Sequence, residues 1–105
     1  MPPCSYNQSV IIEFDPAKSE RNARKRGLPF ERADEFDWGT ALIIEDTRED
    51  YGEPRFRVFG FIGDRMHTLV FTPREGGVRV ISLRKANRRE ERKYEKETES
   101  RDGRR

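Results

Sequence analysis

Residues 53–84 read EPRFRVFGFIGDRMHTLVFTPREGGVRVISLR, and this run predicts three short antiparallel strands. Aromatic and β-branched residues alternate there with polar ones, which is the pattern of a sheet with one buried face. A Gly-Asp step and a Gly-Gly step separate the apolar runs and provide the turns. We therefore expect strands at residues 55–62, 66–72 and 78–84.

The first hairpin loop is predicted at Gly63 and Asp64. A two-residue loop of type II′ fits this pair, because glycine accepts the positive φ that the first loop position requires. This loop sets a register that pairs Ile62 with Arg65, Val58 with Leu69 and Phe56 with Phe71.

The second loop has two possible lengths. A two-residue loop at Gly76 and Gly77 would place Arg74 directly opposite Arg79, and like charges in that position are unfavourable. We therefore expect a three-residue loop over residues 76–78. It pairs Thr72 with Ser82 and Phe71 with Leu83.

In this register the apolar side chains lie on one face of the sheet. The expected core residues are Phe56, Val58, Ile62, Leu69, Phe71, Ile81 and Leu83. The opposite face carries Glu53, Arg55, Arg57, Thr72, Arg74, Ser82 and Arg84. Guanidinium groups donate pairs of hydrogen bonds to phosphate oxygens, so this face suits a phosphate backbone. The alternative is an ordinary solvated sheet face.

The rest of the chain predicts an α+β fold in which two N-terminal helices and a C-terminal helix pack against an antiparallel sheet of three to five strands. Asp15 and Pro16 begin a helix that ends at Gly27. A capping box of Asn87 and Glu90 begins the last helix. Further elements are expected as a strand at 10–14, a helix at 29–37 and a strand at 41–44.

Composition indicates one small domain, residues 1–105, with an ordered core at about residues 10–97 and flexible termini. The charged fraction of 40% exceeds the hydrophobic fraction of 32%, so the core is small. The net charge is only +2, but residues 18–26 and 79–105 are strongly basic, which fits contact with nucleic acid. The single cysteine, Cys4, fits a reducing cytoplasm, and no apolar run predicts a membrane span.

Several kinds of site are not expected. One cysteine and one histidine cannot form a zinc site, and the Gly76-Gly77 pair lacks the lysine of a phosphate-binding loop, so we expect no metal and no cofactor. The histidine, His67, falls on the core face opposite Gly60, which favours a structural role.

The order and spacing of several short motifs resemble the BrnT toxins, over roughly residues 12–94. The motifs are Phe14-Asp15-Pro16-Ala17-Lys18, Asn22, Lys25-Arg26-Gly27-Leu28, Phe30-Glu31 with Ala33, Glu53 with Arg55, Gly60, Thr72-Pro73-Arg74, the run from Arg79 to Ala86, and the helix from Asn87 to Tyr94. The resemblance implies a RelE-like fold and the toxin of a type II toxin–antitoxin pair. It also implies a cytoplasmic ribonuclease that inhibits translation.

The resemblance further implies a partner, a BrnA-like antitoxin with a ribbon-helix-helix DNA-binding domain, in a heterotetramer that binds operator DNA. Phe59, Phe61, Met66 and Val70 lie on the arginine side of the sheet. Either the C-terminal helix covers this apolar patch or the antitoxin does.

For metal-independent cleavage, the 2′-hydroxyl of RNA attacks the neighbouring phosphate, and arginine stabilises the added charge. The hypothesis is that Arg84 and Arg74 clamp the scissile phosphate, Arg55 assists, and Glu53 orients Arg74 or acts as a base. The residues expected to bind RNA are Lys18, Lys25, Arg26, Arg57, Thr72, Ser82 and Tyr94.

The chain departs from the family at Arg26, where a histidine is common, so the identity of the general acid and base is open. A second class of function therefore stays under consideration. It is a non-catalytic module that binds nucleic acid or serves as the partner of a repressor.

Overall fold

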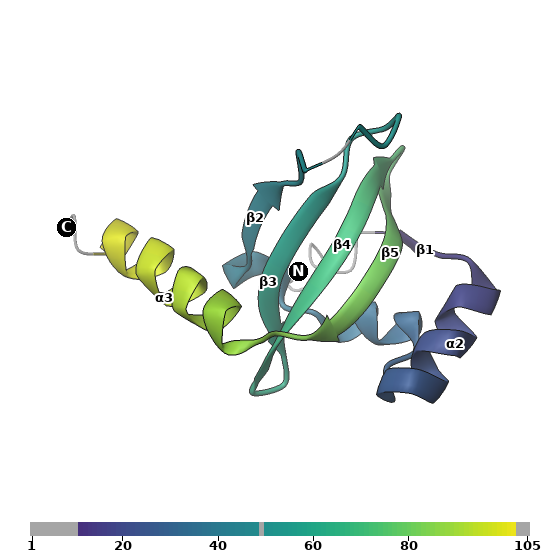
Figure 1. The fold of residues 1–105 in the computed structure, drawn as a ribbon, viewed down its shortest axis with the longest axis horizontal. Coiled ribbons are helices and arrows are strands. Elements are labelled where there is room, and N and C mark those ends of the chain that lie inside the picture. The colour runs from purple at the N-terminus through teal and green to yellow at the C-terminus, as the bar shows by residue number, and fades with distance from the viewer. Residues whose placement is uncertain (1–10, 49, 103–105) are drawn as a thin grey trace, which may run out of the picture.

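The sheet has the strand order β1-β5-β4-β3-β2, and its last four strands in the sequence form one antiparallel meander (Figure 1). The computed structural model describes residues 11–48 and 50–102. Strand β1 lies parallel to β5 at the edge of the sheet. The elements are β1 (Ile11–Glu13), α2 (Pro16–Arg26), the 3₁₀ helices η1 (Phe30–Glu35) and η2 (Trp38–Thr40), β2 (Leu42–Glu45), β3 (Phe56–Ile62), β4 (Arg65–Arg74), β5 (Gly77–Lys85) and α3 (Arg88–Asp102).

The predicted α+β class is confirmed, with one difference in the edge strand. Strand β1 pairs in parallel with β5, which makes the five-stranded sheet mixed. Residue 10 of the expected first strand lies outside the described residues, as do Cys4 and the expected flexible ends at residues 1–9 and 103–105. Helix α3 continues to Asp102, past the expected end of the ordered core.

Helix α2 has the predicted bounds, and its ends show why. The Asp15 carboxylate accepts a hydrogen bond from the amide of Ala17 at 2.9 Å, and Pro16 occupies the first turn. Gly27 stops the helix with a left-handed φ of 70°. The helix expected at residues 29–37 is instead the tighter 3₁₀ helix η1, and Phe30, Ala33 and Phe36 of this segment are buried.

The first hairpin has the predicted register. Ile62 pairs with Arg65, Val58 with Leu69 and Phe56 with Phe71. Gly63 has a φ of 65°, while Asp64 has no positive φ, as a type II′ loop requires.

The predicted second hairpin is wrong in its loop and in its register. Arg74 pairs with Gly77, so the loop contains two residues, Glu75 and Gly76, and Gly76 has a φ of 78°. A bulge between Val70 and Phe71 then shifts the pairing. Like charges are still separated, because the shorter loop places Thr72 opposite Arg79 and leaves Arg74 opposite a glycine.

The bulge changes which side chains of β5 enter the core. Val70 pairs with Ser82 and Phe71 with Val80, so Ile81 has no partner on β4. The core therefore contains Val78, Val80 and Leu83, and the expectation that Ile81 is a core residue is wrong. Ile81 is half-buried and lines a hollow beside α2.

The main core lies between one face of the sheet and the segment that follows α2. Phe36 packs against Trp38, and Trp38 packs against Phe71, with ring centroids 5.0 Å and 5.7 Å apart. Gly60 permits this packing, since a Cβ atom there would lie 2.8 Å from the Phe36 ring. These aromatic residues are therefore packing residues of the main core.

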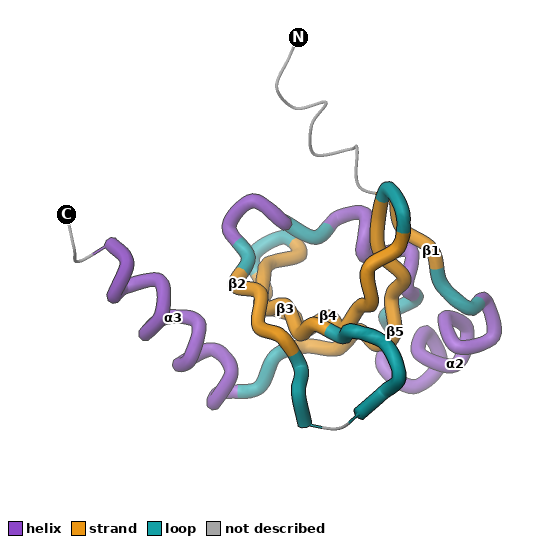
Figure 2. Tube along the Cα trace, turned by 90° about the horizontal axis from the view of Figure 1, so that it is seen from above, coloured by secondary structure: helices purple, strands orange, loops and turns teal. Residues whose placement is uncertain are grey.

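Helix α3 begins with the predicted capping box. The Asn87 side chain accepts from the Glu90 amide at 2.8 Å, and the Glu90 carboxylate accepts from the Asn87 amide at 3.0 Å. Viewed from above, the sheet is strongly curved and α3 projects away from it (Figure 2). The first two turns of α3 contact the sheet, where Tyr94 packs edge-on against Phe61.

This contact belongs to a second apolar cluster on the arginine side of the sheet. It consists of Phe59, Met66 and Ala86, with Leu42, Ile44, Phe61 and Tyr94 packed against them. Helix α3 thus covers part of the predicted apolar patch.

One polar residue connects α2 to the sheet. The side-chain amide of Asn22 donates to the carbonyl of Leu28 at 2.7 Å and to the carbonyl of Leu83 at 2.8 Å. These bonds join three segments that no strand pairing connects.

Replacement of Asn22 with alanine removes both bonds and leaves two carbonyls without their donors. We expect Asn22→Ala to lower the free energy of unfolding by about 1–3 kcal/mol. Urea denaturation measures this loss. The exposed neighbour Arg21 provides the control, and Arg21→Ala is expected to change stability by less than about 0.5 kcal/mol. Equal stability of the two variants would contradict the role of Asn22.

Candidate nucleic-acid interface

Five arginines share the face of the sheet opposite the main core, and this surface is called the arginine face below. They are Arg55, Arg57, Arg74, Arg79 and Arg84. The sequence identified four of them on this face. The fifth, Arg79, was not predicted on this face. It pairs with Thr72, where the predicted register had placed Ser82.

At the open end of the meander, two carboxylates connect three of these arginines. Glu13 of β1 lies 3.0 Å from Arg79 and 3.8 Å from Arg74. Glu53 lies 3.9 Å from Arg74 and 3.7 Å from Arg55. The structure thus brings together Glu53, Arg55 and Arg74, three of the four residues proposed as catalytic. Their charges are largely balanced by carboxylates.

The loop between β2 and β3 supplies an aromatic ring to this cluster. The ring of Tyr51 lies under the guanidinium of Arg55, with Cζ 4.2 Å from the ring centroid. Asp46, which is 5% exposed, holds the loop through hydrogen bonds from Arg48 and Tyr51. Hydrogen bonds from Arg48 place the pKa of Asp46 far below its usual value and outweigh the effect of burial. The ion pair therefore fixes the ring that supports Arg55.

Arg84 lies at the other end of the arginine face and is held by the C-terminal helix. Its Nη1 and Nη2 atoms donate to the two carboxylate oxygens of Glu90 at 2.9 Å and 2.7 Å. Thr68, which pairs with Arg84 across the sheet, donates to the same carboxylate at 2.9 Å. Nη1 also donates to the Lys85 carbonyl, which leaves two of the five guanidinium N–H groups for another ligand.

Glu90 is 8% exposed, and its environment favours the ionised form. Burial raises its pKa, but hydrogen bonds from Arg84, from the Asn87 amide and from Thr68 outweigh that effect and lower the pKa to about 2. Glu90 therefore serves both the helix cap and the ion pair that places Arg84.

Arg57 lies between the two clusters and differs from the other arginines of the face. Among the residues that the structure describes, no carboxylate forms an ion pair with Arg57, whereas each of the other four has one. Arg57 on β3 pairs with Val70 on β4, and Val70 pairs with Ser82 on β5, so Val70 lies between Arg57 and Ser82. Arg57 is thus a positive charge in the middle of the face without a carboxylate to balance it.

Two residues predicted to bind RNA have structural contacts instead. Thr72 is 1% exposed and donates to the carbonyl of Pro54 at 2.7 Å. The hydroxyl of Tyr94 donates to the carbonyl of Thr40 at 2.8 Å, which anchors α3 beside η2. The Thr72 bond connects β4 to the segment before β3, and the Tyr94 bond connects α3 to η2.

Ser82 lies on this face, opposite Val70, whereas the three other residues predicted to bind RNA lie away from it, on α2. Lys18, Lys25 and Arg26 are exposed and line a hollow of about 260 Å³ between α2 and β5. Arg84 and Arg74 are also separated, since Thr68, the partner of Arg84, lies six residues from Arg74 along β4. That separation is about 20 Å. The two arginines cannot share one phosphate while each keeps its carboxylate.

Sequence reasoning missed three contributors to the site. Glu13 and Arg79 meet only through the parallel pairing of β1 with β5, which no local pattern signals. Glu90 was identified as a helix cap, but its pairing with Arg84 depends on where α3 leaves the sheet.

Within residues 11–48 and 50–102, no group of three or more His, Cys, Asp or Glu residues is arranged to bind a metal ion. No helix in the same ranges is long and apolar enough to cross a membrane.

Comparison with known proteins gives one match. A family model described as "Ribonuclease toxin, BrnT, of type II toxin-antitoxin system" matches residues 14–90. The matched region includes the whole meander, the arginine face and Glu90. No curated protein and no solved structure gives a significant match.

The lowered pKa of Glu90 predicts a pH-dependent contribution to stability. The contribution is complete above the ordinary pKa of 4.5 and is lost as the pH falls toward 2, because protonation weakens the pair with Arg84. Between about pH 6 and about pH 3, the wild type should lose about 2 kcal/mol more free energy of unfolding than Glu90→Gln. Urea denaturation at both pH values measures the difference, and identical losses would contradict the assigned role of Glu90.

Proposed function

This chain belongs to the BrnT family of ribonuclease toxins of type II toxin–antitoxin systems, and we propose that it is a metal-independent endoribonuclease whose active surface is the arginine face. As a toxin of this type it has a protein antitoxin as its partner. The substrate is RNA in the cytoplasm, and its cleavage inhibits translation.

The observation that carries this proposal is the unbalanced charge of Arg57 at the centre of the face. When a 2′-hydroxyl attacks the adjacent phosphate, negative charge accumulates on the phosphate oxygens. A guanidinium without a carboxylate partner interacts with that charge without first losing an ion pair. Within the described part of the chain, Arg57 is the arginine of the face that meets this condition.

The proposed catalytic residues flank this position. Arg84 is held by Glu90 and offers its two remaining N–H groups to the phosphate on one side. Arg55 and Arg74 contact the RNA backbone on the other side, and Glu53 orients both of them or acts as the base. Ser82 lies next to this path, on β5, and donates a hydrogen bond to phosphate.

For the partner, we propose a BrnA-like antitoxin with a ribbon-helix-helix domain, in a heterotetramer that binds operator DNA. The surface left for such a partner includes α3, which projects from the sheet (Figure 1). Beyond its first turns α3 is strongly charged, so a partner of complementary charge fits it.

A second candidate function has one observation in its favour. Four of the five arginines on the face already have carboxylate partners. Such a balanced surface also fits a non-catalytic module, one that binds nucleic acid or partners a repressor. A single assay distinguishes the two functions, because a nuclease cleaves RNA and a binding module leaves it intact.

The assay is cleavage of RNA by the purified, antitoxin-free chain in EDTA. We expect cleavage to leave 2′,3′-cyclic phosphate ends and Arg57→Ala to lower the rate about 10²-fold or more, as removal of one charge-stabilising donor does. Arg24→Ala is the matched control, because Arg24 is exposed on α2 and away from the face. Wild-type cleavage that persists in Arg57→Ala would exclude the assignment, and intact RNA would favour the second candidate.

Arg84 requires a second comparison, since its loss also disturbs α3. We expect Arg84→Ala to lower the cleavage rate about 10²-fold or more. Glu90→Gln keeps the guanidinium but removes the charge that orients it, so a smaller loss is expected. Circular dichroism of both variants separates unfolding from loss of catalysis. A fully active and folded Arg84→Ala would remove Arg84 from the mechanism.

A further inference from the structure

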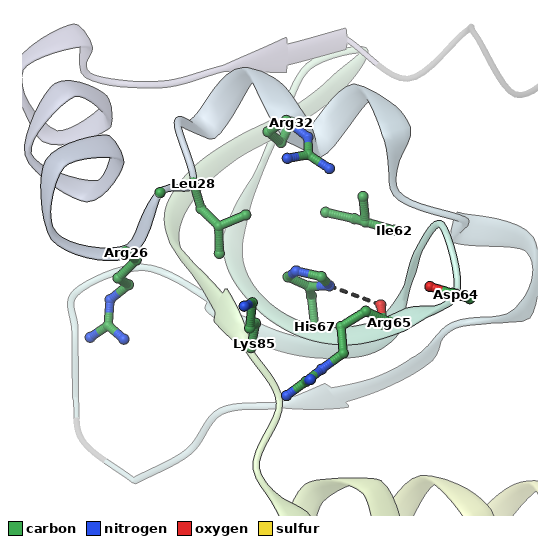
Figure 3. Close-up of a pocket in the computed structure, with 9 residues that line it drawn as sticks. Arg26, Leu28, Arg32, Ile62, Asp64, Arg65, His67 and Lys85 are labelled. Carbon is green, nitrogen blue, oxygen red and sulfur yellow. Dashed lines mark hydrogen bonds between the residues drawn. The ribbon is translucent and has the colours of Figure 1, made fainter.

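A cavity of about 630 Å³ lies on the core side of the sheet, away from the arginine face. The first hairpin, the end of α2, η1 and the end of β5 surround it (Figure 3). Its volume falls within the range of about 300–1,000 Å³ that is usual for small-molecule sites. Its walls include four cationic side chains, Arg26, Arg32, Arg65 and Lys85, and one acidic side chain, Asp64.

The charge of this cavity is not balanced. Within the described part of the chain, Arg26, Arg65 and Lys85 form no ion pair. The fourth cation, Arg32, is balanced, because its Nε lies 2.9 Å from a carboxylate oxygen of Glu35. Like charges around one cavity repel each other, and an anion bound between them relieves that repulsion.

His67 stands at the centre of the cavity and is 4% exposed. Its Nδ1 lies 2.9 Å from the carbonyl oxygen of Arg65, and because a carbonyl only accepts, Nδ1 carries the proton. Burial lowers the pKa of His67, and the charges of Arg32, Arg65 and Lys85 lower it further. The ring is therefore neutral near pH 7, and its Nε2 is an acceptor that bonds no described protein atom.

We propose that this cavity binds a ribonucleotide unit of RNA, with the phosphate held by Arg65 and Lys85 and the neighbouring 2′-hydroxyl donating to Nε2 of His67. The proposal rests on the proposed function, because it adds a second contact with the same substrate. Arg26 belongs both to this cavity and to the basic hollow on α2. A continuous basic path therefore leads from Lys18 and Lys25 to the cavity.

The acceptor on His67 is what favours RNA over an acidic protein segment. A carboxylate or the dianion of a phosphate monoester satisfies the cations but has no hydrogen to donate to Nε2. A ribose 3′-phosphate has an anion and a hydroxyl on adjacent carbons, and DNA lacks that hydroxyl. The cations and the neutral histidine together fit a ligand that has an anion beside a hydroxyl, as a ribonucleotide has.

The test is a titration of the full chain with adenosine 3′-monophosphate and with its 2′-deoxy form, observed by NMR. His67 is the only histidine of the sequence, so its ring signals are identified directly. We expect the ribonucleotide to shift these signals and to bind up to about tenfold more tightly than the deoxy form, because one hydrogen bond distinguishes them. Equal binding of the two, or an unchanged His67 ring, would overturn the proposal.

Two variants and one control locate the phosphate. Lys85 and Arg65 are exposed, so Lys85→Ala and Arg65→Ala are expected to fold and to weaken ribonucleotide binding about tenfold each. Arg24→Ala removes an equal charge outside the cavity and should leave the affinity unchanged. Affinity that is the same in all three variants would place the nucleotide elsewhere and refute the site.

The outcome is separable from that of the nuclease assay. Ribonucleotide binding without RNA cleavage would support the cavity and count against the proposed function. Cleavage that depends on Arg57, with no nucleotide bound beside His67, would refute the cavity alone. A shift of the His67 signals by the antitoxin but not by the ribonucleotide would assign the cavity to the partner and overturn the proposal.

Discussion

The bulge in the pairing of β4 with β5 is the constraint on which the rest of the arginine face depends. It leaves Ile81 without a partner and shifts the end of β5 along β4, so that Arg84 lies beside Thr68. At that position Arg84 reaches Glu90 at the start of α3. The bulge thereby sets the place of the C-terminal helix, because the ion pair and the capping box share one carboxylate.

The cationic side chains of this protein form two groups, which differ in whether carboxylates balance their charges. On the arginine face, four arginines have carboxylate partners, and Arg57 lies between them with no partner among the described residues. Around His67 and along α2, the described cations mostly lack such partners. A paired arginine is fixed in position but offers less net charge to a ligand, whereas an unpaired one attracts anions from solution. The arginine face therefore suits the orientation of a bound substrate, and the cations around His67 and along α2 suit the attraction of an anionic substrate from solution.

The sequence predicted much of the fold because the decisive signals were local. The bounds of α2 follow from Asp15, Pro16 and Gly27, and the register of the first hairpin follows from a single Gly-Asp loop. The second hairpin could not be predicted in the same way. Charge repulsion correctly excluded Arg74 opposite Arg79, but a shorter loop combined with a bulge satisfies the same condition, and only packing of Val78 and Val80 in the core selects it.

The sequence by itself determined the two faces of β3 and β4, since side chains alternate along a regular strand, but not those of β5, where the bulge interrupts the alternation. It also determined the family, through the order of its short motifs across residues 14–90. Tertiary structure alone decided which charges meet. Glu13 with Arg79, Glu90 with Arg84, and the cations around His67 are brought together from distant segments. Ion pairing depends on distances of a few ångströms, and one bulged residue changes those distances while the alternation of the sequence stays the same.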